Sequence, residues 1–135
     1  MRAALILAVC TLIAFGCKES SPTAPPSAAD LNGIWVGALS AVPTGEDWTQ
    51  VRLSLHTVGT TPTGTLTSRN GVVHPVTGHN ESIGTYLEVG QLPQNAPCSV
   101  TLIVKRVTSD AMVGSLSGRC PNTLLDNFRL EKSAT

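Results

Sequence analysis

Short runs of alternating apolar and polar residues, separated by turn-forming residues, constrain this chain more than any other feature. The clearest run is 48–58, in which Val51, Leu53 and Leu55 would share one side of a strand and polar residues the other. A two-residue period is typical of a β-strand with one face in a core and one face in water. From Leu31 onward no segment shows the 3.6-residue period of an amphipathic helix. The sequence therefore predicts an all-β domain.

Eight such runs follow one another, with Gly, Pro, Asn and Asp between them. The expected strands are Leu31–Ala41, Trp48–Val58, Thr63–Arg69, Val72–Thr77, Ser82–Gly90, Cys98–Val107, Ala111–Arg119 and Leu124–Lys132. Sequential strands joined by short turns favour an antiparallel up-and-down meander, and closure into an eight-stranded barrel removes both exposed edges. The interior of such a barrel is filled by side chains or holds one small ligand. The alternative is a two-sheet β-sandwich, which would bury Trp35 without any interior.

The N-terminus is typical of a cleavable secretion signal. Arg2 precedes an uncharged apolar run over 3–16 that ends in small residues. With roughly 14 residues, this run is shorter than the ~20 that a membrane-spanning helix needs. We therefore divide the chain into a signal peptide, a tether, a β-barrel domain and a short tail, at residues 1–16, 17–29, 30–132 and 133–135.

The end of the signal, Ala14-Phe15-Gly16-Cys17, resembles the lipobox of bacterial lipoproteins, although Phe15 and Ala14 differ from the usual small and Leu-like residues. The resemblance implies that Cys17 is diacylated and becomes the new N-terminus. The alternative is ordinary signal-peptidase cleavage after Gly16, which would leave Cys17 as a free thiol. Residues 18–29 contain three prolines among small polar residues, which indicates an extended spacer between a membrane and the domain.

The four cysteines then divide into two groups. Cys10 leaves with the signal, and Cys17 is the expected lipid acceptor. Cys98 and Cys120 remain, and two remaining cysteines in an oxidising compartment usually form a disulfide.

A hairpin between the sixth and seventh strands supports this pairing. If Val107 pairs with Ala111, then nine residues further along each strand Cys98 lies opposite Cys120. Both cysteines would then lie on the apolar face of the hairpin. Cross-linking a loop of this length should stabilise the fold by about 3 kcal/mol.

The first expected strand contains Gly33-Ile-Trp35, which resembles the opening of lipocalin-like and avidin-like (calycin-type) barrels. The resemblance implies that the Trp35 indole lies across the closed end of the barrel. It also implies that a basic residue near the last strand covers the ring by cation–π attraction, and Arg129 lies in that region. Arg129 alternates with apolar neighbours, so it faces outward unless the strand ends there. The alternative is that Trp35 is an ordinary core residue.

The sequence contains no candidate catalytic constellation. His56, His74 and His79 are the only side chains suited to acid–base chemistry near neutral pH. The spacing of His74 and His79 matches no known metal-binding motif, and we expect both to be solvated residues of a turn. His56 falls on the polar face of its strand. We therefore predict no enzyme activity, no metal site and no cofactor.

The balance of charges and the composition of one expected loop indicate which kinds of partner the domain could bind. Without the signal, eight basic and nine acidic residues remain, which offers no basic surface for nucleic acid. The expected loop over 42–48 places Glu46 and Asp47 beside Trp48, and this aromatic residue next to two acids is a candidate partner site. The alternative places Trp48 in the core as the first residue of its strand.

These observations predict a bacterial cell-envelope protein, anchored to the membrane through acylated Cys17 or, alternatively, soluble in the periplasm or secreted. The first expected function is binding of a small apolar or amphipathic ligand inside the barrel. The second is a protein-binding module, such as a periplasmic inhibitor of a protease or of lysozyme. The third is a structural surface lipoprotein without a specific ligand.

Overall fold

The structure is a computed structural model that describes residues 27–40, 45–92, 99–118 and 127–134. In these ranges the chain forms one short 3₁₀ helix and eight strands. They are η1 (Ala28–Leu31), β1 (Gly33–Gly37), β2 (Val51–Val58), β3 (Thr61–Thr67), β4 (Val73–Glu81), β5 (Gly84–Val89), β6 (Val100–Val107), β7 (Ala111–Gly118) and β8 (Asn127–Lys132). The signal, Cys17 and the expected tether as far as residue 26 lie outside the described residues, whereas the last residues of the expected tether, 27–29, lead into η1 and form its first turn.

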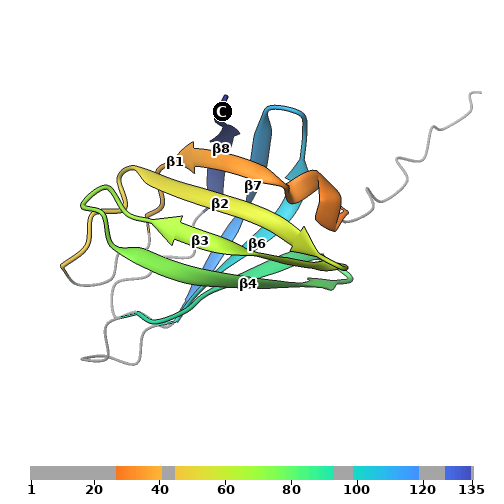
Figure 1. Ribbon diagram of the computed structural model, residues 1–135, viewed down its shortest axis with the longest axis horizontal. Coiled ribbons are helices and arrows are strands. Elements are labelled where there is room, and N and C mark those ends of the chain that lie inside the picture. The colour runs from red at the N-terminus through yellow and green to blue at the C-terminus, as the bar shows by residue number, and fades with distance from the viewer. Residues whose placement is uncertain (1–26, 41–44, 93–98, 119–126, 135) are drawn as a thin grey trace, which may run out of the picture.

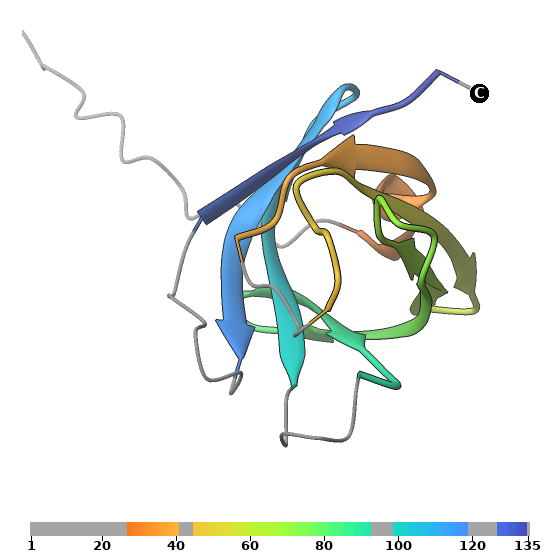
Figure 2. The same cartoon turned by 90° about the vertical axis from the view of Figure 1, so that its left-hand side faces the viewer.

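The strands form a closed barrel in which each pairs antiparallel with the next and β8 returns to β1 (Figures 1 and 2). The predicted eight-stranded up-and-down barrel is therefore confirmed, and the β-sandwich is wrong. The barrel closes through Trp35↔Lys132 and Val36↔Glu131, so the first and last strands pair with each other at this seam.

The strands form where apolar residues recur at every second position. In β2, Val51, Leu53 and Leu55 are buried while Arg52 and His56 are exposed. The same alternation runs through most of the barrel, because successive side chains of a strand point to opposite sides. The buried side chains of all eight strands meet in one continuous apolar core inside the barrel.

Strand β4 is longer than expected. The sequence predicted that it ends at Thr77 before a turn, whereas it continues to Glu81. Gly78 belongs to the strand: a Cβ on this residue would lie 2.8 Å from the Leu87 side chain of β5 and 2.5 Å from the Pro62 side chain of β3. This glycine therefore permits close packing between neighbouring strands and does not mark a turn.

The β6–β7 hairpin follows the expected register over most of its length. Pairs from Val104↔Gly114 to Val100↔Gly118 agree with it, but nearer the turn Val107 pairs with Met112 and not with Ala111. A β-bulge between Val104 and Arg106 absorbs this shift of one residue. Cys98 and Cys120 lie outside the described residues, so their disulfide stays a prediction.

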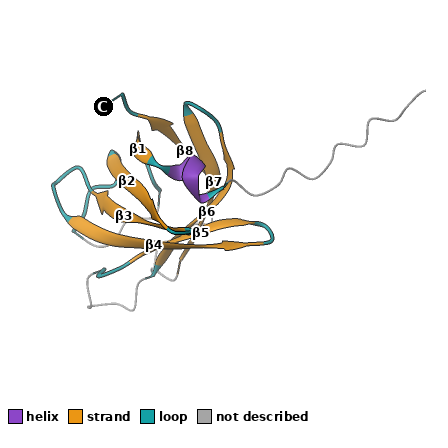
Figure 3. Cartoon of the chain, turned by 45° about the vertical axis from the view of Figure 1, so that its right-hand side comes forward, coloured by secondary structure: helices purple, strands orange, loops and turns teal. Residues whose placement is uncertain are grey.

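The helix η1 covers one end of the barrel, next to β2 and β3 (Figure 3). Its last residue, Leu31, is completely buried in the core. Ser27 and Asp30 stabilise this single turn, because the backbone amide and hydroxyl of Ser27 both donate to the Asp30 carboxylate. At the opposite end β1, β3, β5 and β7 finish, and the segment that leads into β2 packs over the barrel (Figure 2).

Candidate functional site

The end of the barrel near η1 is closed by Trp35. This side chain is fully buried, and its Nε1 donates a hydrogen bond of 2.9 Å to the Leu31 carbonyl oxygen. The Lys132 ammonium lies 5.1 Å from the centre of the Trp35 ring, within the range of a cation–π interaction. Gly33 makes room for this arrangement, because a Cβ there would lie 2.8 Å from Cε of Lys132.

The basic residue over Trp35 is therefore Lys132, and the expectation of Arg129 is wrong. Arg129 alternates with the buried Phe128 and Leu130 along β8, so its side chain points out of the barrel. Its Nε lies 3.8 Å from the carboxylate of Glu131 on the same outer face. Lys132 reaches the ring because the strand ends there, opposite Trp35 in the β1–β8 register.

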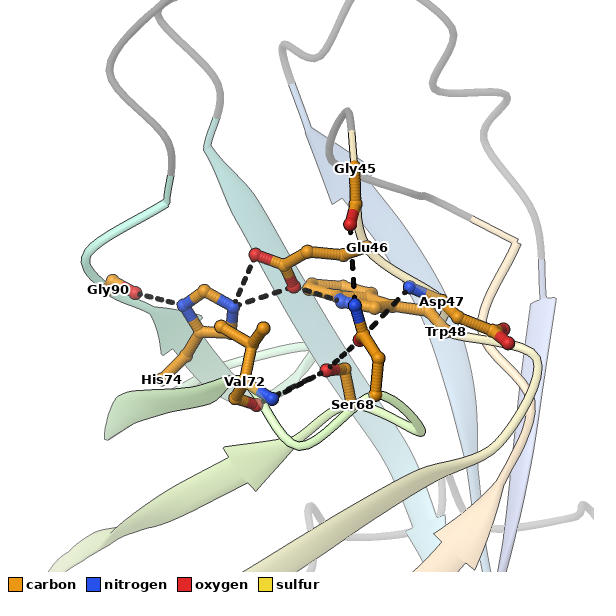
Figure 4. Close-up of polar contacts among 9 residues, drawn as sticks. Gly45, Glu46, Asp47, Trp48, Ser68, Val72, His74 and Gly90 are labelled. Atoms are coloured by element: carbon orange, nitrogen blue, oxygen red, sulfur yellow. Dashed lines mark hydrogen bonds and ion pairs between the residues drawn. The ribbon is translucent and has the colours of Figure 1, made fainter.

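The opposite end of the barrel holds a second buried indole, Trp48, within a polar cluster (Figure 4). Trp48 Nε1 donates a 2.7 Å hydrogen bond to Oε2 of Glu46. The same carboxylate lies 2.8–2.9 Å from Nε2 of His74, and the two side chains are only 5% and 2% exposed. Nδ1 of His74 lies 3.2 Å from the Gly90 carbonyl oxygen. The cluster joins β4, the end of β5 and the segment before β2.

The hydrogen-bond partners of His74 determine how many protons this cluster holds. Nδ1 faces a carbonyl oxygen and must donate, while Nε2 faces a carboxylate that already accepts from Trp48. A proton must therefore lie between His74 and Glu46, either on the imidazole or on the carboxyl group. In both cases the pair is neutral overall, which is the condition under which two ionisable groups can be buried together.

The structure corrects the expectation for the histidines. His74 is buried in β4, because it lies on the same face of the strand as the core residue Val76. His79 is also a strand residue, but it is half exposed, stacks on Tyr86 and lies 3.1 Å from Glu81. His56 faces solvent, as expected, 3.1 Å from the Thr63 hydroxyl.

The segment that carries Glu46 and Trp48 is fixed to the β3–β4 connection. The Asn70 side chain donates to the Gly45 carbonyl and accepts from the Asp47 amide, and the Arg69 amide donates to the Asp47 carbonyl at 2.9 Å. Asn70 also accepts a hydrogen bond from the Ser68 hydroxyl (Figure 4). Two sets of contacts therefore hold Glu46 and Trp48 in place: their own contacts inside the barrel, and the hydrogen bonds between residues 45–47 and the β3–β4 connection.

Of the three residues of the candidate partner loop, only Asp47 is accessible. Glu46 and Trp48 are buried, so the alternative that places Trp48 in the core is the one that the structure takes. Asp47 is 41% exposed and lies 3.9 Å from Arg69. The pKa of Asp47 is lowered, mainly because the hydroxyl and amide of Thr49 donate to its carboxylate, with a smaller contribution from Arg69.

Described residues line cavities at three places on the surface of the barrel, among others. The first, of about 600 Å³, lies over β1 between β8 and the start of β2. The second, of about 400 Å³, lies over the β4–β5–β6 face, and the third, of similar size, lies beside the β6–β7 turn.

Across the described parts of the chain, no group of three or more His, Cys, Asp and Glu residues is placed to hold a metal ion. No helix among these residues has the length and apolar character needed to cross a membrane.

Comparisons with known proteins assign no family to this chain. No family model, curated protein or solved structure matches it. Function must therefore be inferred from the geometry described above.

Proposed function

We propose that this chain is an exported envelope protein, tethered through acylated Cys17, whose barrel binds a partner protein on its outer surface. The observation that carries the proposal is the packing of the barrel axis. Trp35 and Trp48 are completely buried at opposite ends, and buried apolar side chains of the other seven strands form one core cluster with them.

This packing favours surface binding over the enclosure of a small ligand. A ligand inside the barrel would have to displace core side chains such as Leu53, Leu102 and Leu116, which are 0–1% exposed. Each large aliphatic side chain removed from such a core costs about 2–5 kcal/mol. Entry from the Trp48 end would also break the hydrogen bonds of Glu46 and His74. The outer surface carries no such penalty.

The chemistry of the buried cluster also favours binding over catalysis. A general base needs a free lone pair directed at a substrate. Both ring nitrogens of His74 are already engaged, and the Glu46 carboxylate is shared between His74 and Trp48. We therefore propose a structural role for this cluster, which holds the segment before β2 over the end of the barrel.

Export and anchoring are supported by the sequence of residues 1–29. An apolar signal, a lipobox-like segment and a proline-rich spacer are consistent with a domain that is held away from a membrane. We expect the mature protein to fractionate with membranes and to carry a diacylglyceryl group on Cys17. The variant Cys17→Ser should move to the soluble fraction, and retention of that variant on membranes would contradict the anchor.

Site-specific photo-crosslinking tests the proposed binding function. A photoreactive amino acid is placed in the full-length chain at Gln50, His79 or Arg106, outward positions on three sides of the barrel. Surface recognition predicts a crosslink to one partner protein from one position and not from the other two. Equal crosslinking from all three positions, or none, would argue against a partner-binding surface.

A further inference from the structure

The largest of the three surface cavities described above is a groove over β1. Its floor is the backbone and small side chains of 36–38. One wall carries Arg129 and Glu131 from β8, and the other carries Gln50 before β2 and Arg69 after β3. The volume of about 600 Å³ lies in the range that binds a few side chains or a small ligand.

The barrel geometry explains why the groove forms here. Gly37 faces inward, and a Cβ on it would lie 2.8 Å from both the Arg129 carbonyl oxygen and the Leu130 side chain, so β1 and β8 approach closely. At the groove, between the long residues of β8 and those that lead into β2, the chain offers only Val36 of β1 and Ala38 directly after it. The longer neighbours on both sides therefore rise above a shallow apolar floor.

The charged residues that line this groove are two arginines and one glutamate. Arg69 and Arg129 line it, and Arg52 lies next to Val36 in the β1–β2 register on the same outer face. Three acids lie nearby: Asp47 at 3.9 Å from Arg69, Glu131 at 3.8 Å from Arg129, and Asp110, whose carboxylate interacts electrostatically with Arg129.

Ion pairs of this length between exposed side chains contribute little, so both guanidinium groups can exchange them for a ligand. Arg129 contacts Glu131 through Nε, and the Arg129 side chain is 58% exposed. On the far side of the barrel, β4 and β5 carry the exposed acids Glu81 and Glu88. Of the four arginines among the described residues, Arg52, Arg69 and Arg129 lie in or beside the groove, and Arg106 lies on β6.

We propose that this groove binds an extended acidic segment of a partner protein. Carboxylates of that segment pair with Arg69 and Arg129, because a guanidinium group presents paired donors that match a carboxylate. The backbone of the segment lies over the small residues of 36–38. This inference rests on the proposed function, namely that a partner binds the outer surface.

Binding of a fluorescein-labelled hexaglutamate peptide to the full-length lipidated protein in nonionic detergent tests the groove. We expect saturable binding at 50 mM NaCl that weakens as salt is raised, because exposed charges are screened. Arg69→Gln combined with Arg129→Gln should weaken binding about tenfold, since two exposed ion pairs are lost. The matched control is Arg106→Gln, an exposed arginine on β6, which should leave affinity unchanged. Thermal melting verifies that each variant folds.

Two results would overturn the proposal. One is the absence of saturable peptide binding at 50 mM NaCl. The other is a loss of binding free energy in Arg106→Gln that is half that of the double variant or more, since one charge is removed in place of two and only net charge would then matter. Self-association that disappears in Glu81→Gln with Glu88→Gln would replace the partner by a second copy of this chain. If the peptide fails to bind while a crosslink forms from His79 or Arg106, the groove is wrong and surface binding elsewhere is retained.

Discussion

At the scale of single residues, the two ends of the barrel are closed in different ways. Trp35 is held by a backbone carbonyl and covered by Lys132, whereas Trp48 is held by a carboxylate that also meets a buried histidine. In both cases the indole N–H has a partner, as buried tryptophans require. Each closure yields a substitution test with a matched control.

Glu46→Ala should lower the free energy of unfolding by about 3 kcal/mol, because it leaves the Trp48 N–H and Nε2 of His74 buried without a hydrogen-bond partner. Glu46→Gln is the matched control. Its amide oxygen can accept from Trp48, and its amide nitrogen can donate to Nε2 of a neutral His74, so the loss should stay below about 1 kcal/mol. Urea unfolding followed by tryptophan fluorescence measures both. Equal losses in the two variants would contradict the hydrogen-bonded cluster.

Lys132→Met should lower the free energy of unfolding by about 1 kcal/mol, since it removes the cation from the Trp35 ring while keeping an apolar stem. Arg129→Met, on the outer face of the same strand, should have almost no effect. Thermal melting compares the two variants. A larger effect at Arg129 would show that the cation over Trp35 contributes nothing.

His74 and Lys132 also show where interpretation of the sequence failed. Alternation places Val72, His74 and Val76 on one face, which was a signal for a buried histidine, but the expected turn obscured it. Its partner Glu46 is 28 residues away, in a segment without any period, so the pairing could not be predicted. The contact of Lys132 with Trp35 was not predicted, because it depends on the residue of the last strand that lies opposite Trp35, and the sequence does not show that register.

At the scale of elements, the two-residue period predicted the strands well, because burial of one face is the property that forms them. The ends of the strands were less accurate. β4 extends past Gly78 since that glycine serves close packing, and the β6–β7 turn is shifted by a bulge that the sequence does not encode in any simple pattern.

We predict that the contribution of Asp110, in the β6–β7 turn, to the free energy of unfolding depends on pH. The Thr108 hydroxyl donates to the Asp110 carboxylate at 2.7 Å, which is the main reason that the pKa of Asp110 is lowered below 3.8. A lowered folded-state pKa means that the ionised carboxylate stabilises the fold above the unfolded-state value, and that this stabilisation is lost as the pH falls through the folded-state value. Asp110→Asn should therefore be less stable than the native chain at pH 7. Urea unfolding at pH 7 and at about pH 2.5 measures this difference, which should disappear in acid; a difference that persists there would contradict the assignment.

At the scale of the whole molecule, a barrel of this size gains from a covalent link. We expect Cys98→Ser with Cys120→Ser to lower the free energy of unfolding by about 3 kcal/mol if the two residues form the expected disulfide. The register of the described part of the β6–β7 hairpin is consistent with that pairing. Thiol titration of the denatured, unreduced mature protein should find no free thiol on either residue. Two reactive thiols would exclude the bridge.

The two closed ends of the barrel also bear on where a partner could bind. With indoles at both ends and one core between them, the interior serves stability, and we propose that recognition takes place on the outer surface, at the groove that Arg69 and Arg129 line. The fold class was predictable because strand number and turn length limit the architecture. The filling of the interior was not, because it depends on long-range packing of side chains from every strand.

The most direct test compares the mass of the full-length mature protein, purified from membranes, under native and denaturing conditions. A filled barrel predicts the same mass in both, namely the polypeptide with the lipid covalently attached at Cys17. A small apolar molecule that is retained at one copy per chain under native conditions, and lost on denaturation, would contradict the conclusion that the interior is a core.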